Sequence, residues 1–146
     1  MRELKHNDFV IGFPEEWEDA SVVILKGLAR GGICPNIAIT RETLEAAAGL
    51  EEYAADQLGQ LQEEFAEQDY LVKMEGLTTV GDVPAFQRFH SFSTQGDAIQ
   101  LQQWQLYVII GTQAITITCT DRAETFNNSY KLFQTAVNQF RALEPQ

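Results

Sequence analysis

The sequence predicts an α+β domain built on a mainly antiparallel sheet, and three features of the chain carry this prediction. Seven segments have the apolar pattern of strands, most of them with a period of two. Two further segments carry apolar residues at helical spacing. Most neighbouring strand segments are joined by short turns, which favours hairpins over parallel crossovers. The expected order is β-β-β-α-β-β-β-β-α, in a single domain over residues 1–146.

Three strands are expected before the first helix, and each ends at a proline, a glycine or a polar stretch: Phe9–Pro14, Ser21–Lys26 and Asn36–Thr40. In the second strand Val22 and Ile24 point one way, and Val23 and Leu25 the other. A strand that is apolar on both faces is usually covered on both. The cover is this chain, a second copy or a bound segment. Gly27–Pro35, which has three glycines and a proline, is expected to be a loop.

The period then changes to that of an amphipathic helix of roughly five turns over Leu50–Phe65. Thr43 or Gly49 marks its expected start. The stretch Glu42–Asp69 holds nine acidic residues and no Lys or Arg. Such acidity is typical of a solvated outer face, and the alternative is a surface that attracts a basic partner or repels wrong ones.

The second half of the chain is expected to hold four strands in hairpin succession and a closing helix: Tyr70–Val80, Phe86–Phe92, Ile99–Ile110, Ala114–Thr120 and the helix Phe126–Phe140. Glycine-containing turns separate these segments, among them Thr94–Asp97 and Gly111–Gln113. Asp121 and Glu124 have the spacing of a capping box before the closing helix.

Charge and composition exclude several functions. The 146 residues include 10 Lys and Arg against 21 Asp and Glu, so the net charge is −11. This charge disfavours binding to nucleic acids and to anionic membrane surfaces. No apolar run approaches the roughly 20 residues of a membrane span, so direct membrane insertion is not expected. The N-terminal segment lacks the apolar core of a signal peptide. We therefore expect a cytoplasmic protein in which Cys34 and Cys119 are reduced, buried thiols.

The sequence carries no catalytic or metal-binding signature. Neither His6 nor His90 lies in a ligand or nucleophile pattern, and the pair Gly31-Gly32 is too short to cradle a phosphate. His6 lies in a polar N-terminal segment that is expected to be mobile, and His90 is expected to be a half-exposed strand residue. We expect no enzyme, no metal site and no cofactor. An enzyme would need one of these histidines in a cleft beside an ordered carboxylate.

Glutamine gathers in two of the predicted elements. Four glutamines lie in the segment Ile99–Ile110, interleaved with Leu101 and Trp104, and three lie in the first helix. A glutamine side chain is a neutral donor and acceptor, so it forms hydrogen bonds in an apolar groove without the cost of burying a charge. Helix pairs in membranes use the same mixture of close packing and neutral hydrogen bonds. The alternative is that these glutamines face solvent.

The order of elements and several short motifs resemble a known superfamily. The segment Phe13–Asp19 looks like the P-x-G-W-x-D opening of DcrB-like, PsbP-like domains, although Glu16 stands where glycine is common. Three further segments resemble one branch more closely, the effector-associated (Eag) adaptor chaperones of type VI secretion systems: Asn36–Glu42, Gly96–Trp104 and Ile115–Thr120. The motifs are short, but the likeness runs over nearly the whole chain.

The resemblance implies a curved antiparallel sheet backed by helices, in a homodimer of the Gram-negative cytoplasm. Its partner would be the hydrophobic N-terminal transmembrane segments of an effector, often next to a PAAR domain, which the adaptor keeps soluble until loading on the secretion spike. The rival is a stand-alone DcrB-like binding domain with a small ligand or a regulatory protein partner. The candidate groove residues are Val22, Ile24, Ile37, Ile39, Gln60 and Gln102. If the opposite strand face forms the groove, Val23, Leu25 and Ala38 replace the aliphatic members.

Overall fold

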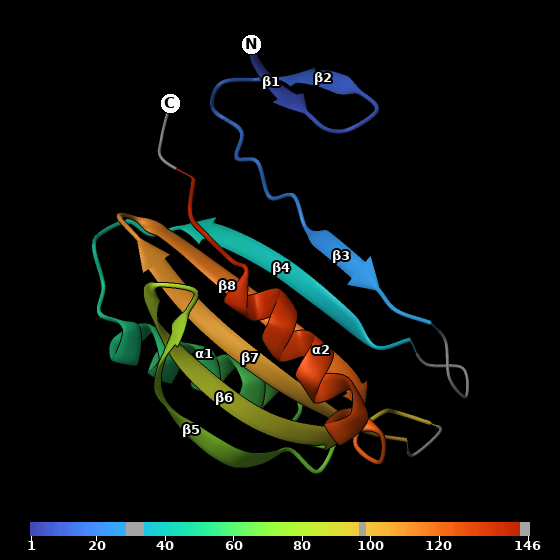
Figure 1. The fold of residues 1–146 in the computed structure, drawn as a ribbon. Helices are drawn as coiled ribbons and strands as arrows, with labels where there is room; N and C mark the ends of the chain where they lie inside the picture. The colour runs from blue at the N-terminus through green and yellow to red at the C-terminus, as the bar shows by residue number, and fades with distance from the viewer. Residues whose placement is uncertain (29–33, 97–98, 144–146) are drawn as a thin grey trace.

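The computed structural model describes residues 1–28, 34–96 and 99–143. They form an N-terminal hairpin and a six-stranded antiparallel sheet with one helix on each face (Figure 1). The elements in chain order are β1 (Arg2–Lys5), β2 (Val10–Phe13), β3 (Val23–Lys26), β4 (Asn36–Thr43), α1 (Leu50–Glu64), β5 (Leu71–Val80), β6 (Val83–Ser93), β7 (Gln100–Ile110), β8 (Gln113–Arg122) and α2 (Phe126–Asn138). The predicted α+β class and antiparallel sheet are confirmed.

The large sheet has the strand order β3-β4-β8-β7-β6-β5. Three consecutive hairpins build β5 to β8, and β8 then pairs with β4, which precedes α1 in the chain. Gly81 and Gly111 have positive φ angles of 58° and 62°, a conformation that the tight turns β5–β6 and β7–β8 require and that glycine adopts without steric cost. The sheet therefore has two edges, β3 and β5.

One face of the sheet carries the main hydrophobic core under α2. Trp104, Leu106 and Val108 of β7 point to this face and pack with Phe126 and Phe133 of α2. The helix begins after Thr125 and has no side-chain cap, so the predicted capping box is wrong. The carboxylate of Asp121 instead accepts hydrogen bonds from the hydroxyl groups of Thr125 (3.1 Å) and Ser129 (2.7 Å). These bonds fasten the first turn of α2 to the end of β8.

The opposite face is covered only in part, by α1. Tyr53 and Ala54 are the buried residues of this helix, and they pack on Tyr107 of β7 and Ala114 of β8. α1 lies over β6 and β7, whereas β4 and β3 extend beyond it (Figure 1). We call this side of the sheet the α1 face. Its outer part, over β4 and β3, has no helix packed extensively on it among the described residues.

The N-terminal part of the chain departs from the sequence prediction in two ways. Residues 2–5 form β1, paired with β2, where a mobile segment was expected. Arg2–Lys5 consists of three charged residues and one leucine, so the pattern alone does not mark a strand. Ser21–Lys26 was expected to be covered on both faces, by this chain, a second copy or a bound segment, but β3 is an edge strand and the side chains of Val23, Ile24 and Leu25 are 45–60% exposed. Parts of the predicted loop Gly27–Pro35, with the pair Gly31-Gly32, and of the turn Thr94–Asp97 lie outside the described residues.

Candidate functional site

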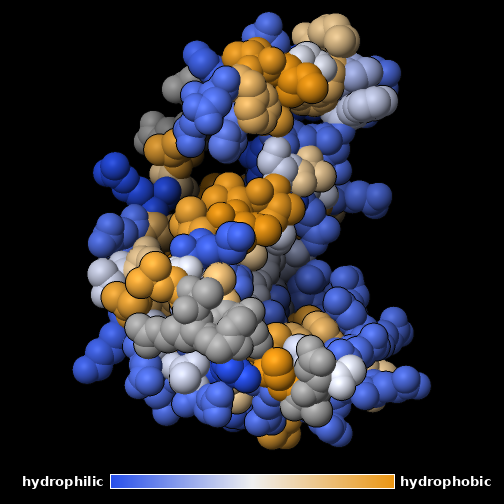
Figure 2. All heavy atoms as spheres, turned by 90° about the vertical axis from the view of Figure 1, so that its right-hand side faces the viewer, coloured by the Kyte–Doolittle hydropathy of each residue, from blue (hydrophilic) through white to orange (hydrophobic). Residues whose placement is uncertain are grey.

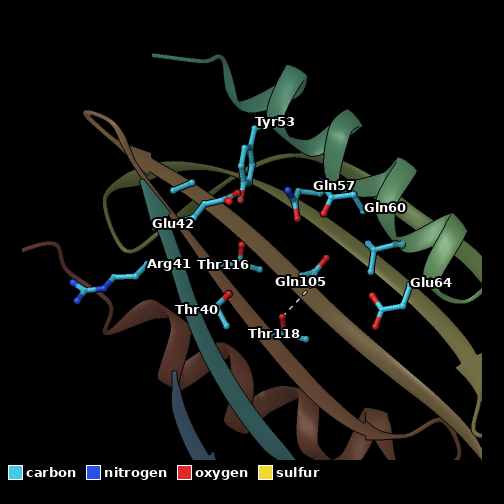
Figure 3. Close-up of a pocket in the computed structure, with 12 residues that line it drawn as sticks. Thr40, Arg41, Glu42, Tyr53, Gln57, Gln60, Glu64, Gln105, Thr116 and Thr118 are labelled. Carbon is cyan, nitrogen blue, oxygen red and sulfur yellow. Dashed lines mark hydrogen bonds between the residues drawn. The ribbon is translucent and has the colours of Figure 1, made fainter. Parts of the chain in front are cut away.

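A groove of about 390 Å³ runs along the α1 face between α1 and the strands β4 and β8 (Figure 3). We call it the α1 groove. It forms because α1 packs on β6 and β7 and stands away from β4. Twelve residues line it: Thr40, Arg41, Glu42, Tyr53, Gln57, Gln60, Leu61, Glu64, Gln105, Ala114, Thr116 and Thr118. The helix supplies one wall and the exposed half of the sheet supplies the floor.

Neutral polar groups dominate the floor and the helical wall of the groove. Thr116 and Thr118 point up from β8, Gln105 points up from β7, and Gln57 and Gln60 point down from α1 (Figure 3). The Gln105 amide donates a hydrogen bond to the Thr118 hydroxyl over 3.2 Å. These hydroxyl and amide groups both donate and accept hydrogen bonds without carrying charge. The groove is therefore suited to a ligand segment that offers neutral hydrogen-bonding groups.

Three charged residues line the groove, Arg41, Glu42 and Glu64, and the first two have partners of their own. The Tyr53 hydroxyl donates to the Glu42 carboxylate over 2.5 Å. Burial and the nearby Glu42 carboxylate together raise the pKa of the Tyr53 hydroxyl well above its usual range, so it stays a donor. Arg41 points away from the groove and pairs with Asp19 at 2.5 Å (Figure 3). No charge is therefore directed into the centre of the groove by these two residues.

The α1 groove continues toward the β3 edge as an apolar surface. Paired residues of neighbouring antiparallel strands share a face, and β3 pairs Ile24 with Ala38 of β4. Ala38 lies on the same face as Thr40 because side chains alternate along a strand. Ile24 is 60% exposed and Val22, just before β3, is 53% exposed. Figure 2 shows apolar atoms gathered in a patch over this edge of the molecule. Aliphatic and neutral polar groups thus adjoin on one open face.

The structure divides the predicted groove residues between the two faces. Gln60 lines the α1 groove, and Ile24 lies on the same face. Ile37 and Ile39 point to the other face, where they pack against the core under α2. Gln102 also points to the α2 face, as Trp104 does two positions on, and it accepts a hydrogen bond from Lys73 over 2.8 Å. The set expected on one surface therefore does not share one.

The alternative aliphatic set, Val23, Leu25 and Ala38, is divided in the same way. Val23 and Leu25 pair with Ile39 and Ile37 and lie on the α2 face, whereas Ala38 lies on the α1 face. Leu25, Ile37 and Ile39 line a small apolar cavity of about 180 Å³ beside α2. The sequence reasoning missed Gln57, Gln105 and the three groove threonines, Thr40, Thr116 and Thr118. The signal was present, because the alternating threonines of Ala114–Thr120 indicate a half-exposed strand face.

A buried polar network lies beneath α1, and it includes His90, one of the two histidines that were considered for chemistry. His90 was expected to be half-exposed but is fully buried. One ring nitrogen lies 2.9 Å from the Tyr70 hydroxyl and the other 2.7 Å from the Gln103 side-chain oxygen. Burial lowers the pKa of His90, so the neutral ring is favoured. Arg88, also buried, donates to Glu75 over 3.0 Å. Both ring nitrogens of His90 serve this network.

Three further observations concern residues that could hold other groups. The described ranges contain no cluster of three or more His, Cys, Asp or Glu side chains placed to bind a metal ion. Cys119 is buried and Cys34 is half-buried, and both are free thiols. Across residues 1–28, 34–96 and 99–143 no helix is long and apolar enough to cross a membrane.

Comparison with known proteins gives the family. The DcrB family model matches residues 10–139, and the chain belongs to the DcrB family. No curated protein sequence matches it. The match begins at β2 and ends just after α2, so it covers the whole six-stranded sheet with both helices.

Solved structures show the same fold at low sequence identity. A Pseudomonas aeruginosa protein of unknown function, PA94, described as a putative regulator, aligns with a TM-score of 0.81 and 16% identity over 99% of both chains. The cyanobacterial PsbP protein CyanoP from Synechocystis aligns with a TM-score of 0.59 and 8% identity, covering 90% of this chain and 98% of its own. LpqN of Mycobacterium tuberculosis, involved in cell envelope biogenesis, aligns with a TM-score of 0.52 and 11% identity, covering 89% of this chain and 88% of its own. The predicted PsbP-like fold is confirmed.

Proposed function

We propose that this DcrB-family protein is a cytoplasmic adaptor chaperone that binds hydrophobic N-terminal transmembrane segments of a type VI secretion effector and shields them before loading on the secretion spike. It works without catalysis or a cofactor, and as a homodimer. The observation that carries the proposal is the open α1 face, where the threonine and glutamine side chains of the α1 groove adjoin the exposed apolar residues of β3.

The apolar part of this face supplies the affinity. A transmembrane helix in water exposes aliphatic side chains along its whole length, and Ile24 and Ala38 offer matching surface. Covering about 400 Å² of apolar surface at roughly 25 cal/mol per Å² contributes on the order of 10 kcal/mol before ordering costs. A gain of this size is sufficient to hold a helix that would otherwise aggregate.

The neutral polar part of the face supplies selectivity for helices that belong in a membrane. Transmembrane helices carry Ser, Thr, Asn and Gln at the positions where they pair with other helices. Gln57 and Gln60 on one wall, and Thr116 and Thr118 on the floor, offer donors and acceptors to such residues. Buried charges in their place would need a charged partner, which these segments lack.

The proposal is tested with two pairs of matched variants in co-purification with a tagged effector N-terminal region. Gln60→Arg places a charge in the α1 groove, whereas Gln62→Arg makes the same change at an exposed residue of α1 that does not line the groove. Ile24→Asp changes the α1 face of β3, whereas Val23→Asp changes its other face. We expect Gln60→Arg and Ile24→Asp to lower client recovery at least tenfold, with both controls near wild type. Equal recovery in all four would refute the groove assignment.

A second candidate function follows from the PA94 structure, whose description as a putative regulator suggests a regulatory protein partner. A regulator of that kind would bind a folded partner and show no preference for apolar helices. The same co-purification separates the two functions. A chaperone of apolar helices would no longer bind a client segment whose apolar residues are replaced by polar ones, whereas a regulator's binding to its folded partner would not depend on that segment.

A further inference from the structure

We infer that the Thr118 hydroxyl is a fixed hydrogen-bond donor in the α1 groove and that it selects client segments with a neutral acceptor oxygen at that position. The inference rests on the proposed function, since it specifies the chemistry that the groove requires of its client. Its basis is a row of hydrogen bonds that crosses the sheet beneath α1. The row begins at the buried guanidinium of Arg88 and ends at Thr118 on the groove floor.

Four side chains from three neighbouring strands form this row, which we call the Arg88 row. Arg88 of β6 donates to the Tyr107 hydroxyl over 2.7 Å, and that hydroxyl donates to the side-chain oxygen of Gln105. The Gln105 amide then donates to the Thr118 hydroxyl oxygen over 3.2 Å (Figure 3). The strand register produces the arrangement, because Gln105 pairs with Arg88 on one side and with Thr118 on the other.

The charge on Arg88 fixes the direction of the bonds in the row. A guanidinium has donors and no acceptor, so the Tyr107 oxygen accepts from it. Burial raises the pKa of the Tyr107 hydroxyl to about 12, so this group keeps its one hydrogen and donates it to Gln105. With the Gln105 amide turned round, the hydrogen of the fully buried Tyr107 hydroxyl would have no acceptor among the described residues. The amide NH2 group of Gln105 therefore faces Thr118.

The Thr118 hydroxyl is left with an occupied oxygen and an unused hydrogen. A hydroxyl group carries one hydrogen and two lone pairs, and the Gln105 amide takes one of these lone pairs. Within the part of the chain that the structure describes, no group accepts a hydrogen bond from Thr118. The residue is half-buried and lines the α1 groove. Its hydrogen is thus available to a ligand that lies in the groove.

The cation at the far end of the row strengthens this donor. Hydrogen bonds in series polarise one another, and the effect is larger where the surrounding dielectric constant is low. Arg88 is 1% exposed and Tyr107 is fully buried, so water screens the first part of the row very little. The row therefore transmits part of the positive character of the buried guanidinium to the half-buried Thr118 hydroxyl.

The charges around the donor define the class of ligand. Glu42 and Glu64 line the same groove and disfavour a carboxylate on the ligand. A ligand group with donors only would direct its hydrogens against that of Thr118. The class that fits is a neutral oxygen, which an apolar helix supplies from Ser, Thr, Asn or Gln side chains, or from a backbone carbonyl beside a small residue. A purely aliphatic helix would leave the Thr118 hydrogen without a partner when it covers the groove, which weakens binding.

The test compares the affinities of the protein for two model helices that differ only at guest residues. Both are Leu/Ala peptides of about 20 residues with lysines at their ends. One carries O-methylserine at every fourth residue, and the other carries norvaline at the same places. O-methylserine has an ether oxygen that accepts but cannot donate, and norvaline has a methylene group instead. We expect the wild type to bind the O-methylserine helix roughly threefold to tenfold more tightly, the range that one neutral hydrogen bond gives.

The variants locate the donor. Thr118→Val removes the hydroxyl and should bring the ratio of the two affinities close to one, whereas Thr118→Ser keeps a hydroxyl and should keep the preference. Tyr107→Phe interrupts the row but leaves the bond from Arg88 to Ala54 of α1, so the ratio should fall while α1 stays attached. A merely structural defect would weaken binding of both helices equally and leave the ratio unchanged. Thr79→Val, at an exposed threonine of β5 outside the groove, is the control and should keep the wild-type ratio.

Equal affinity of the wild type for the two helices, or a wild-type ratio in Thr118→Val, would overturn the inference. If neither helix binds, the chaperone function is refuted and the selection of clients falls with it. A neutron diffraction structure of the free protein tests the direction of the hydroxyl groups separately. It should show the Tyr107 deuterium directed to Gln105 and the Thr118 deuterium directed into the groove. A Thr118 deuterium directed to Gln105 would overturn the inference whatever the helices do.

Discussion

Replacing Arg88 with methionine should weaken the attachment of α1 to the sheet. Arg88 lies on β6 and is 1% exposed. Its guanidinium donates to the Tyr107 hydroxyl over 2.7 Å and to the backbone carbonyl of Ala54 in α1 over 2.9 Å. It also donates to Glu75 over 3.0 Å. α1 has only two buried residues, so this one side chain carries a large share of its contact with the sheet.

The expected loss can be estimated bond by bond. A hydrogen bond that involves a charged group contributes about 1.5–3 kcal/mol, and the two bonds to Tyr107 and Ala54 are buried. The bond to Glu75 is discounted because that carboxylate is 40% exposed. The two buried bonds sum to about 3–6 kcal/mol. Methionine keeps most of the apolar volume and removes the desolvation cost of the buried charge, so the loss should be near the lower end, about 3 kcal/mol, or roughly 6–12 °C in melting temperature for a chain of this size.

The assay is urea and thermal unfolding, with Lys73→Met as the control. The Lys73 ammonium donates to Gln102 at an exposed position, so its loss should be within about 0.5 kcal/mol. Hydrogen exchange of α1 amides should also rise in Arg88→Met, while that of α2 stays close to wild type. A loss below about 1 kcal/mol for Arg88→Met, or one equal to the control, would show that packing alone holds α1.

Three further predictions concern buried groups and one turn. Burial depresses the pKa of His90 in the folded state, so the unfolded chain binds more protons just below about pH 6.5 and the stability of the wild type should fall there as pH decreases. The urea midpoint of His90→Gln should fall less steeply with decreasing pH than that of the wild type. Parallel curves for the two proteins would contradict this. Burial raises the pKa of the Cys119 thiol to about 12, so alkylation at mildly alkaline pH should require denaturant; rapid labelling of the native protein would contradict this. Gly81→Ala should lower the free energy of unfolding by several kcal/mol, because the new Cβ would meet the carbonyl of Phe140. Gly111→Ala, which has a similar φ but open space around the Cβ, should lower it by about 1–2 kcal/mol. Equal melting temperatures of the two variants would show that the chain after α2 moves to make room for the Cβ.

The sequence predicted the elements of the sheet better than their exposure. The period of two marks β6, β7 and β8 because each packs a face against a helix, and burial of every second residue favours alternating apolar and polar residues. The sequence of β3 predicts a strand covered on both faces, because both faces are apolar, yet the strand lies at an edge of the sheet. Within one chain, a face that another copy or a client covers has the same composition as a core face. Composition therefore cannot tell where the cover comes from.

The candidate site was predicted only in part for a related reason. Alternation within a strand shows which residues share a face, but it does not show which face of one strand matches which face of the next. Ile24 and Ile37 belong to adjacent strands, and their pairing register, Ile24 with Ala38 and Leu25 with Ile37, puts them on opposite faces. Gln60, expected as a polar contact, lines the α1 groove, where the apolar stripe of α1 limits which of its residues meet the sheet. For Gln102 no such constraint existed.

The most direct test of the chaperone function is co-expression of this protein with the apolar N-terminal region of a candidate effector, followed by affinity purification and light scattering. The account predicts a monodisperse soluble complex whose mass corresponds to two copies of this chain on each transmembrane region, with the effector segment insoluble when expressed alone. An aggregated effector beside free adaptor, together with no binding of unrelated apolar helices, would contradict it.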